Sequence, residues 1–336
     1  MRLIGGIGLL LAAMLLALSS LGSTRAVAAA ASATLELESK IYLGEVHGRL
    51  DHLAIDLSRQ RLFVAELGND SVGVVELKRG TVRTLTELNE PQGVGYVPST
   101  DTLYVASARD GAVRLFQGAG LTPAGQIVLG GDADNIRVDD AAHLIFVGYG
   151  NGALAVIDAV SRRRIADIPL RAHPESFQLE PGGRRIFVNV PDASEIGVVD
   201  RVTGKPIATW GTDSLRANFA LALDEAHRTV LAIFRHPAKV GVFRAEDGHL
   251  VTTVSTCGDA DDLFIDAKRN RIYVSCGEGY LAVLALQNER YQELARIATA
   301  PGARTSLFVP EIDRLLLAVR AAGTTPASVW VFRPGP

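Results

Sequence analysis

Two copies of the tetrapeptide Gly-Asp-Ala-Asp are the part of this chain best suited to bind an ion. They run over 131–134 and 258–261, and a further acid, Asp262, extends the second copy. Carboxylate and carbonyl oxygens are the ligands that Ca²⁺ takes in proteins. The carboxylates that would hold the ion are Asp132, Asp134, Asp259, Asp261 and Asp262. A structural interpretation stands beside this one, because an aspartate also caps its own turn through its side chain.

Histidines, arginines and further polar residues occur at comparable places in other loops. Such a mixed set could bind a small anionic or sugar-like ligand, with arginine giving bidentate recognition. A histidine beside a carboxylate could instead act as a general base in lactone or ester hydrolysis. The structural alternative is a water-filled polar funnel whose charges neutralise one another. The candidate ligand-binding residues are Arg49, Asp51, His52, Asp134, Asn135, His173, Glu175, Arg216, Asn218, Asp261, Asp262 and Arg304.

Several catalytic and cofactor motifs are absent from the sequence. It contains no C-x-x-C-H for covalent haem, no H-E-x-x-H for a zinc protease and no G-x-S-x-G nucleophile turn. We therefore assign no catalytic residue and expect no cofactor. Ca²⁺ is the one ion that the acidic loops could bind.

A repeated apolar strand must position these polar loops. It returns seven times, at steps of 41 to 44 residues, in strings such as RLFVA, RIFVN and RIYVS. Its central residues are Phe63, Tyr104, Ile145, Ile186, Val230, Ile272 and Leu315. A period near 40 residues, made of short strands and polar turns, is typical of a β-propeller with one four-stranded sheet per repeat. We predict an all-β, seven-bladed β-propeller with antiparallel blades over 34–336.

The last repeat lacks its fourth strand, and the beginning of the mature chain can supply it. A third strand follows each repeated one, and six repeats continue into a fourth, whereas the seventh stops at Phe332. The segment 34–46, TLELESKIYLGEV, alternates like a strand. Pairing it with the last blade would close the ring and cover two sheet edges.

The loops between repeats carry the candidate residues. In a propeller, these inter-blade loops share one face with the loops that join the second and third strands of each blade. We call this the inter-blade face and expect any site to lie there, around the central channel. The inter-blade loops cover 48–52, 90–93, 130–135, 172–176, 214–218, 257–262 and 301–305.

The only two cysteines, Cys257 and Cys276, are predicted to form a disulfide. They lie at the start of the first strand and the end of the second strand of the sixth repeat, so an antiparallel hairpin brings them to the same end. An even cysteine count in an exported protein favours a bridge. The C-x-x-C spacing of a redox-active pair is absent.

The N-terminal segment 1–33 predicts export. Arg2 precedes an apolar stretch, 3–21, and the small residues around 26–28 offer cleavage sites. A signal peptide is the favoured interpretation, and an uncleaved anchor is the alternative. We expect a periplasmic or secreted monomer, of a Gram-negative type of bacterium, without stable membrane insertion after cleavage. The formal net charge of −3 does not favour nucleic acid as a partner.

Strings such as RLFVAELGNDSVGVVEL and RIFVNVPDASEIGVVDRVTGKPIATW, together with TLYVAS over 102–107, resemble the YVTN-type (YncE-like) β-propeller repeat proteins. The resemblance spans residues 34 to 334, although RTVLAI and RLLLAV depart from the repeat pattern. It implies an exported seven-bladed propeller and supplies no catalytic residues.

The favoured function is therefore non-catalytic. The sequence predicts a binding or scaffold protein that holds a peptide, a protein or a small polar ligand at the inter-blade face. The alternative is a lactonase-like hydrolase that uses a metal or a His/carboxylate pair at the same face.

Overall fold

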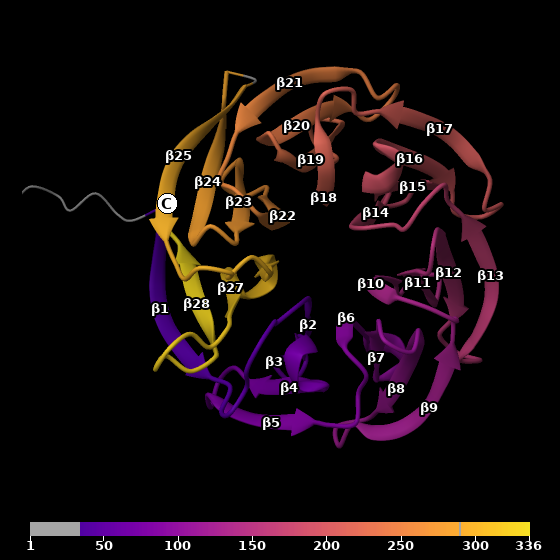
Figure 1. The fold of residues 1–336 in the computed structure, drawn as a ribbon, viewed down its shortest axis with the longest axis vertical. Coiled ribbons are helices and arrows are strands. Elements are labelled where there is room, and N and C mark those ends of the chain that lie inside the picture. Colours follow the sequence, from indigo (N-terminus) through magenta and orange to yellow (C-terminus); the bar gives the residue numbers. More distant parts are fainter. Residues whose placement is uncertain (1–33, 289) are drawn as a thin grey trace, which may run out of the picture. The chain divides into compact units, whose positions relative to one another are not determined.

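The computed structural model describes residues 34–288 and 290–336, and the predicted signal peptide over 1–33 lies outside them. The described residues form seven four-stranded antiparallel sheets arranged around a central channel, as Figure 1 shows. The predicted seven-bladed β-propeller is thereby confirmed.

Each blade runs from an innermost strand at the channel to an outermost strand at the rim. The innermost strands are β2 (Leu53–Asp56), β6 (Pro91–Val97), β10 (Ala133–Asp139), β14 (Phe177–Leu179), β18 (Arg216–Asp224), β22 (Ala260–Asp266) and β26 (Ser306–Val309). The second strands are β3 (Arg61–Glu66), β7 (Thr102–Ser107), β11 (Leu144–Tyr149), β15 (Arg185–Val190), β19 (Thr229–His236), β23 (Arg271–Cys276) and β27 (Arg314–Val319).

The third strands are β4 (Ser71–Glu76), β8 (Ala112–Gln117), β12 (Ala153–Asp158), β16 (Glu195–Asp200), β20 (Ala238–Arg244), β24 (Tyr280–Gln287) and β28 (Ser328–Pro334). The outermost strands are β5 (Thr81–Leu85), β9 (Thr122–Val128), β13 (Arg163–Pro169), β17 (Pro206–Gly211), β21 (Leu250–Ser255), β25 (Arg290–Ala298) and β1 (Leu35–Tyr42). Short 3₁₀ turns occur at Leu67–Asn69, Pro98–Thr100, Pro191–Ala193 and Pro310–Ile312.

The repeated apolar residues form the core between the blades. All seven central residues of the repeat lie on second strands and are fully buried. The buried apolar side chains fall into seven clusters, each shared by two neighbouring blades. Adjacent sheets therefore pack face to face around the ring, and burial of this apolar surface holds the blades at fixed spacing.

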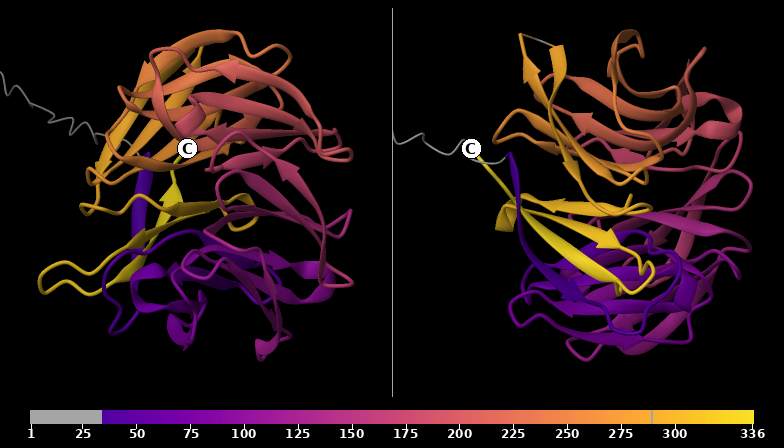
Figure 2. Two further views of the ribbon diagram at one scale, coloured as in Figure 1. Left: turned by 45° about the vertical axis from the view of Figure 1, so that its right-hand side comes forward. Right: turned by 60° about the vertical axis from the view of Figure 1, so that its left-hand side comes forward.

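The chain ends close the ring as predicted. Strand β1 pairs antiparallel with β28, from Leu35 opposite Pro334 to Tyr42 opposite Ser328. Figure 2 shows the indigo strand beside the yellow one. Strand β1 ends at Tyr42 rather than at residue 46, because the chain bends at Gly44, which has a φ of 86°. Leu43 and Val46 still pack into the apolar cluster between the last blade and the first. No helix among the described elements is long and apolar enough to cross a membrane.

Candidate functional site

A polar cavity of about 320 Å³ opens where the inter-blade loops surround the channel, and we call it the mouth cavity. Loops and strand ends from all seven blades contribute to it. Its walls carry five carboxyl groups, three guanidinium groups and two imidazoles. The lining residues are Arg49, Asp51, His52, Gln92, Asp132, Asp134, His173, Glu175, Phe219, Arg235, Asp261 and Arg304.

Four lining residues come from β-bulges at the start of innermost strands. The strand register shifts at Gln92 in β6, between Ala133 and Ile136 in β10, between Asn218 and Leu221 in β18 and at Asp261 in β22. A bulge leaves a residue unpaired and bends the strand, so its side chain can be aimed away from the sheet. The bulges thus deliver Gln92, Asp134, Phe219 and Asp261 to one cavity.

Asp134 is held tightly by the neighbouring blade. A Cβ atom on Gly93 would lie 1.9 Å from the Asp134 carbonyl oxygen, so only glycine allows β6 to pass there. The Asp134 residue is 7% exposed, and its Oδ1 atom has no hydrogen-bond partner among the described residues. A buried carboxylate oxygen without a donor is costly, so Asp134 Oδ1 is able to accept a hydrogen bond from a ligand.

His52 lies at the floor of the cavity among three carboxylates. Its Nε2 atom is 3.8 Å from Asp134 Oδ1 and 3.9 Å from Asp51 Oδ1, and its Nδ1 atom is 3.9 Å from Asp262 Oδ1. Burial lowers the pKa of His52, but the carboxylates of Asp51, Asp262 and Asp134 outweigh burial and raise the pKa to about 9. His52 is therefore a partly buried cation at neutral pH.

The acids around His52 hold their protons more tightly than usual. Burial raises the pKa of Asp51 to about 7, against the opposing effect of His52. Burial and the nearby Asp134 and Asp261 raise the pKa of Glu175 to about 8. Burial also raises the pKa of Asp134 and brings the pKa of Asp262 to about 6. Shifted titrations in a concave site are typical of functional positions.

The three arginines of the cavity are each engaged by a carboxylate. Arg49 donates to Asp51 Oδ2 at 2.7 Å, and Arg235 donates to Asp261 Oδ1 at 2.7 Å. Arg304 pairs with the other oxygen of Asp261 at 2.9 Å and donates to Asp259 at 2.7 Å. The guanidinium of Arg235 also lies 3.5 Å from the centre of the Phe219 ring.

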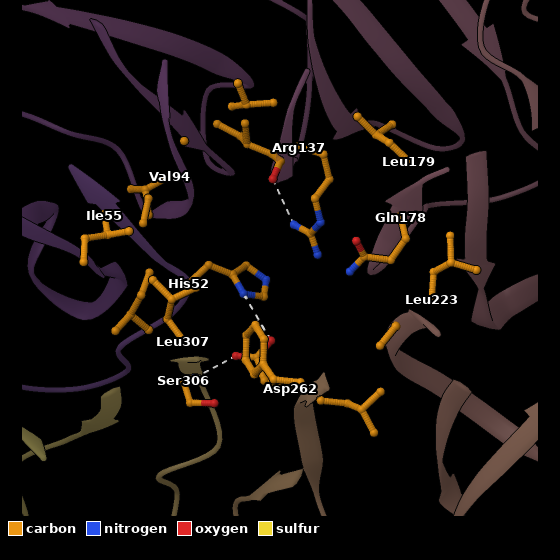
Figure 3. A pocket seen from close by; sticks show the side chains of 18 of the residues that line it. His52, Ile55, Val94, Arg137, Gln178, Leu179, Leu223, Asp262, Ser306 and Leu307 are labelled. Carbon is orange, nitrogen blue, oxygen red and sulfur yellow. Dashed lines mark hydrogen bonds and ion pairs between the residues drawn. The ribbon is translucent and has the colours of Figure 1, made fainter. Parts of the chain in front are cut away.

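A second cavity, of about 460 Å³, follows the innermost strands along the channel. His52 lines both cavities, whereas Asp262 faces the second, as Figure 3 shows. The backbone N–H of Ser306 donates to Asp262 Oδ2 at 2.7 Å. Arg137 and Gln178 point into the same space, and burial lowers the pKa of Arg137.

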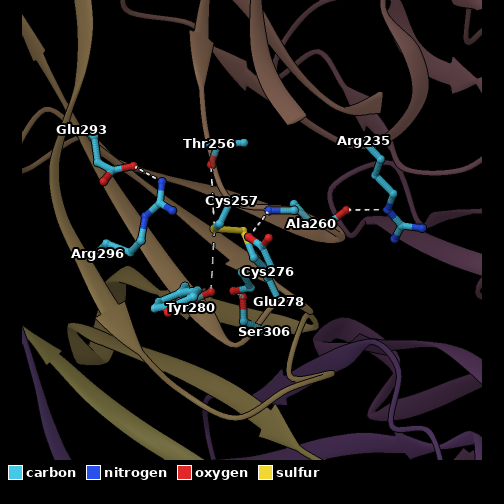
Figure 4. The surroundings of a disulfide bond; sticks show 12 residues. Arg235, Thr256, Cys257, Ala260, Cys276, Glu278, Tyr280, Glu293, Arg296 and Ser306 are labelled. Atoms are coloured by element: carbon cyan, nitrogen blue, oxygen red, sulfur yellow. Dashed lines mark hydrogen bonds and ion pairs between the residues drawn. A yellow bond between two sulfur atoms is a disulfide. The ribbon is translucent and has the colours of Figure 1, made fainter. Parts of the chain in front are cut away.

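The predicted disulfide between Cys257 and Cys276 is present, as Figure 4 shows. Both cysteines are buried, and the bridge joins the start of the loop 257–262 to the end of β23. The same loop is held by backbone hydrogen bonds, including one of 2.8 Å from Gly277 to the Asp259 carbonyl. The disulfide thus fixes the loop that presents Asp261.

Most of the residues predicted from the sequence converge on the mouth cavity. The structure brings together Arg49, Asp51, His52, Asp132, Asp134, His173, Glu175, Asp261 and Arg304. Four of the other predicted residues, Asn135, Arg216, Asn218 and Asp259, do not line it, and Asp262 lies behind His52. Asn218 is fully buried and donates to Asn189 and to the Glu195 carbonyl, so its role is structural.

Three lining residues, Gln92, Phe219 and Arg235, are absent from the predicted set. Arg235 is the residue before the last one of the second strand β19, and the loops after second strands share the inter-blade face, so its place in the repeat could have identified it. Across 34–288 and 290–336, no group of three or more His, Cys, Asp or Glu side chains lies close enough to hold a metal ion. The predicted calcium set thus stays a prediction.

No protein-family model matches the chain. Two curated proteins, the uncharacterized protein YncE of Salmonella typhimurium and that of Salmonella typhi, are each 21% identical to it over 239 residues. Each match covers 66% of this chain and 67% of the relative.

Two solved structures share the fold. A chain of the mitotic checkpoint complex aligns with a TM-score of 0.75 at 16% identity, covering 96% of this chain and 99% of that one. A chain of Kuenenia stuttgartiensis hydrazine synthase aligns with a TM-score of 0.65 at 15% identity, covering 83% and 98%. These two likenesses concern the fold alone. The similarity to YncE, together with the seven-bladed ring, supports the resemblance of this chain to the YncE-like β-propellers.

Proposed function

We propose that this protein is an exported, non-catalytic binding protein whose small polar ligand sits in the mouth cavity. One observation carries the proposal: the carboxyl group of Asp134 is buried at the cavity wall with an oxygen that no described residue satisfies. Proteins rarely leave such an atom without a partner. A bound ligand that donates a hydrogen bond would supply one.

The distribution of exposed apolar side chains favours a cavity ligand over a protein scaffold. On the outermost strands, Val128, Ile165, Ile207, Val251 and Leu294 are exposed and each belongs to a different blade, while Val160 and Val202 are exposed at turns of the third and fourth blades. A surface for a protein partner would gather such side chains in one contiguous patch. Single apolar residues around the rim need no partner.

The disulfide supports the proposed export. Disulfides persist in oxidising compartments and are rare in the cytosol. The bridge between Cys257 and Cys276 is therefore consistent with a periplasmic or secreted protein.

A hydrolase that acts on esters or lactones is the second candidate, and the titration of the cavity favours it. Asp51 and Glu175 have pKa values of about 7 and about 8, close to those of an effective general base or acid at neutral pH. Turnover of a chromogenic ester or lactone that is lost in both Asp51→Asn and Glu175→Gln would support this candidate. Full turnover in both variants would exclude it.

The proposed binding function can be tested by blocking the cavity without changing its charge. The protein is incubated with a library of small polar metabolites and analysed by native mass spectrometry. We expect at least one retained ligand whose binding is lost in Gln92→Trp, because Gln92 lines the mouth. Gln126→Trp, on the exposed outer strand β9 of the same blade, is the matched control and should bind normally.

Either of two results would contradict the proposal. One is a bare polypeptide mass with every compound of the library. The other is a ligand that Gln92→Trp retains as well as the wild type does, since such a ligand binds elsewhere.

A further inference from the structure

We infer that the ligand of the mouth cavity carries a protonated primary amine, which the carboxyl groups of Asp134 and Glu175 receive. The inference rests on the proposed binding function and names the chemical class of the ligand. It depends on which groups of the cavity are already engaged within the protein and which are still able to accept hydrogen bonds.

The groups that would attract an anion are engaged. Arg49 is paired with Asp51, and Arg235 and Arg304 hold the two oxygens of Asp261 between them. An anionic ligand would have to replace these charge-assisted hydrogen bonds, which are among the stronger contacts in proteins. The remaining cation, His52, is surrounded by Asp51, Asp134 and Asp262.

The groups that would attract a hydrogen-bond donor are available. Asp134 Oδ1 is 3.8 Å from His52 Nε2, which is too far for a hydrogen bond, and it has no other partner among the described residues. The Glu175 carboxyl, half-buried in the same wall, makes no hydrogen bond to any described side chain or backbone group. An ammonium group has three donors and could satisfy both carboxyls at once.

Two other kinds of cation fit the cavity less well. A quaternary ammonium needs open aromatic faces, but Phe219 is the only aromatic residue among the lining side chains, and Arg235 lies over its ring at 3.5 Å. A bare metal ion needs several ligating side chains within reach, and no group of three or more converges within the described ranges. A primary amine needs only hydrogen-bond acceptors.

Amine binding should release a proton. Burial raises the pKa of Glu175, and so do the nearby carboxylates of Asp134 and Asp261. His52 and Arg235 lower it, and the resulting pKa is about 8. At neutral pH Glu175 is largely protonated, and a cation beside it favours the ionised form. The affinity for an amine should therefore rise from about pH 6 to about pH 8, by at most about tenfold per pH unit for one released proton.

Isothermal titration calorimetry with three four-carbon probes tests the inference. The probes are putrescine, butanediol and succinate, which differ in their end groups. We expect putrescine to bind best, and Asp134→Asn and Glu175→Gln each to weaken its binding by about tenfold or more. Asp167→Asn, on the exposed face of β13, removes a carboxylate far from the cavity and should leave binding unchanged.

The outcomes separate this inference from the proposed function. Cavity-dependent binding of succinate or butanediol in preference to putrescine would overturn the amine class but keep the binding function. Preferred binding of Ca²⁺, lost in Asp134→Asn, would overturn it in favour of a metal site. Putrescine that fails to bind at millimolar concentration, or that binds both carboxyl variants normally, would also overturn it. Failure of the proposed function itself is read separately, from the Gln92→Trp experiment.

Discussion

His52 separates the two cavities of the ring, and its charge links the acids on both sides. Its backbone N–H donates to the Gln92 carbonyl at 3.2 Å, and its own carbonyl accepts from Ala65 at 3.1 Å, so the backbone of two blades holds it. Asp51 and Asp134 lie near the Nε2 atom on the side of the mouth cavity, and Asp262 lies near the Nδ1 atom on the side of the channel. A neutral side chain here would remove the cation that lies nearest to the buried carboxyls of Asp134 and Asp262.

This arrangement predicts that the protein loses stability as the pH rises. His52 keeps its proton up to about pH 9 in the folded protein, but only to about 6.5 when unfolded. Between these values the folded state binds more protons, so the free energy of unfolding falls with pH, by about 1.4 kcal/mol per unit for one group. Asp51 and Glu175, with raised pKa values, act in the same direction from about pH 4 upward.

Calorimetric melting between about pH 6 and pH 9 measures this effect. The melting temperature should decline across the range, and more weakly in His52→Gln. His143→Gln, at an exposed turn on the opposite face, should follow the wild type. A melting temperature that stays constant, or that rises with pH, would contradict the assigned protonation of His52.

For single residues, the sequence predicts which types of side chain line the mouth cavity better than it predicts which of them contact one another. Asp134 and Asp261 could be found because the same tetrapeptide occurs in equivalent loops, three blades apart. That they face one cavity depends on ring geometry, which spacing along the chain does not contain. Arg235 contacts both Asp261 and the Phe219 ring, but it lies near the end of a second strand, outside the inter-blade loops from which the candidate residues are predicted.

Among the elements, the innermost strands are specialised by their bulges. A regular strand alternates its side chains between the two faces of its blade, so it presents little to the channel mouth. A bulge at Asp134 or Asp261 breaks this alternation where the strand leaves the loop. Bulges have no reliable sequence signature, which is why the repeat predicts the strands but not the cavity that they form.

The disulfide is the element-scale feature whose contribution can be isolated. It closes a segment with a sequence separation of 19 residues and so restricts the unfolded chain. We expect Cys257→Ala/Cys276→Ala to lose on the order of 3 kcal/mol in denaturant unfolding, since this is the entropy of closing a loop of that size. Reduction of the wild type should reproduce the loss, whereas the double variant should not respond. Two free thiols in denatured, unreduced wild type would show that the bridge does not form.

For the whole molecule, the period of the repeat was enough to predict the fold. All seven central residues are buried, and each lies on the second strand of its blade. One apolar position of the repeat was therefore enough to predict where each four-stranded sheet lies. Ring closure could also be predicted, because six complete repeats and one incomplete repeat leave one strand to be supplied. The closing strand ends at Tyr42, earlier than the predicted residue 46, because the chain bends at Gly44 although Leu43 and Val46 still pack between the blades.

Closure by β1 makes a prediction about the ring as one cooperative unit. Leu35 packs into the cluster between the last two blades, and Ile41 packs into the cluster between the last blade and the first. Leu35→Ala and Ile41→Ala should each lower the free energy of unfolding by about 2 to 5 kcal/mol, because each removes buried apolar contacts. The two losses should add, because the side chains belong to separate clusters.

The control uses the exposed face of the same strand. Glu36 pairs with Arg333, and Glu38 pairs with Arg314 and Arg333, at the surface. The double variant Glu36→Ala/Glu38→Ala should therefore cost only about 1 kcal/mol or less per pair. Denaturant unfolding should give a single transition for all these variants if the blades unfold together. Apolar variants that are no less stable than the glutamate variant would mean that β1 does not close the ring in solution. A separate early transition confined to the apolar variants would mean that the last blade unfolds on its own.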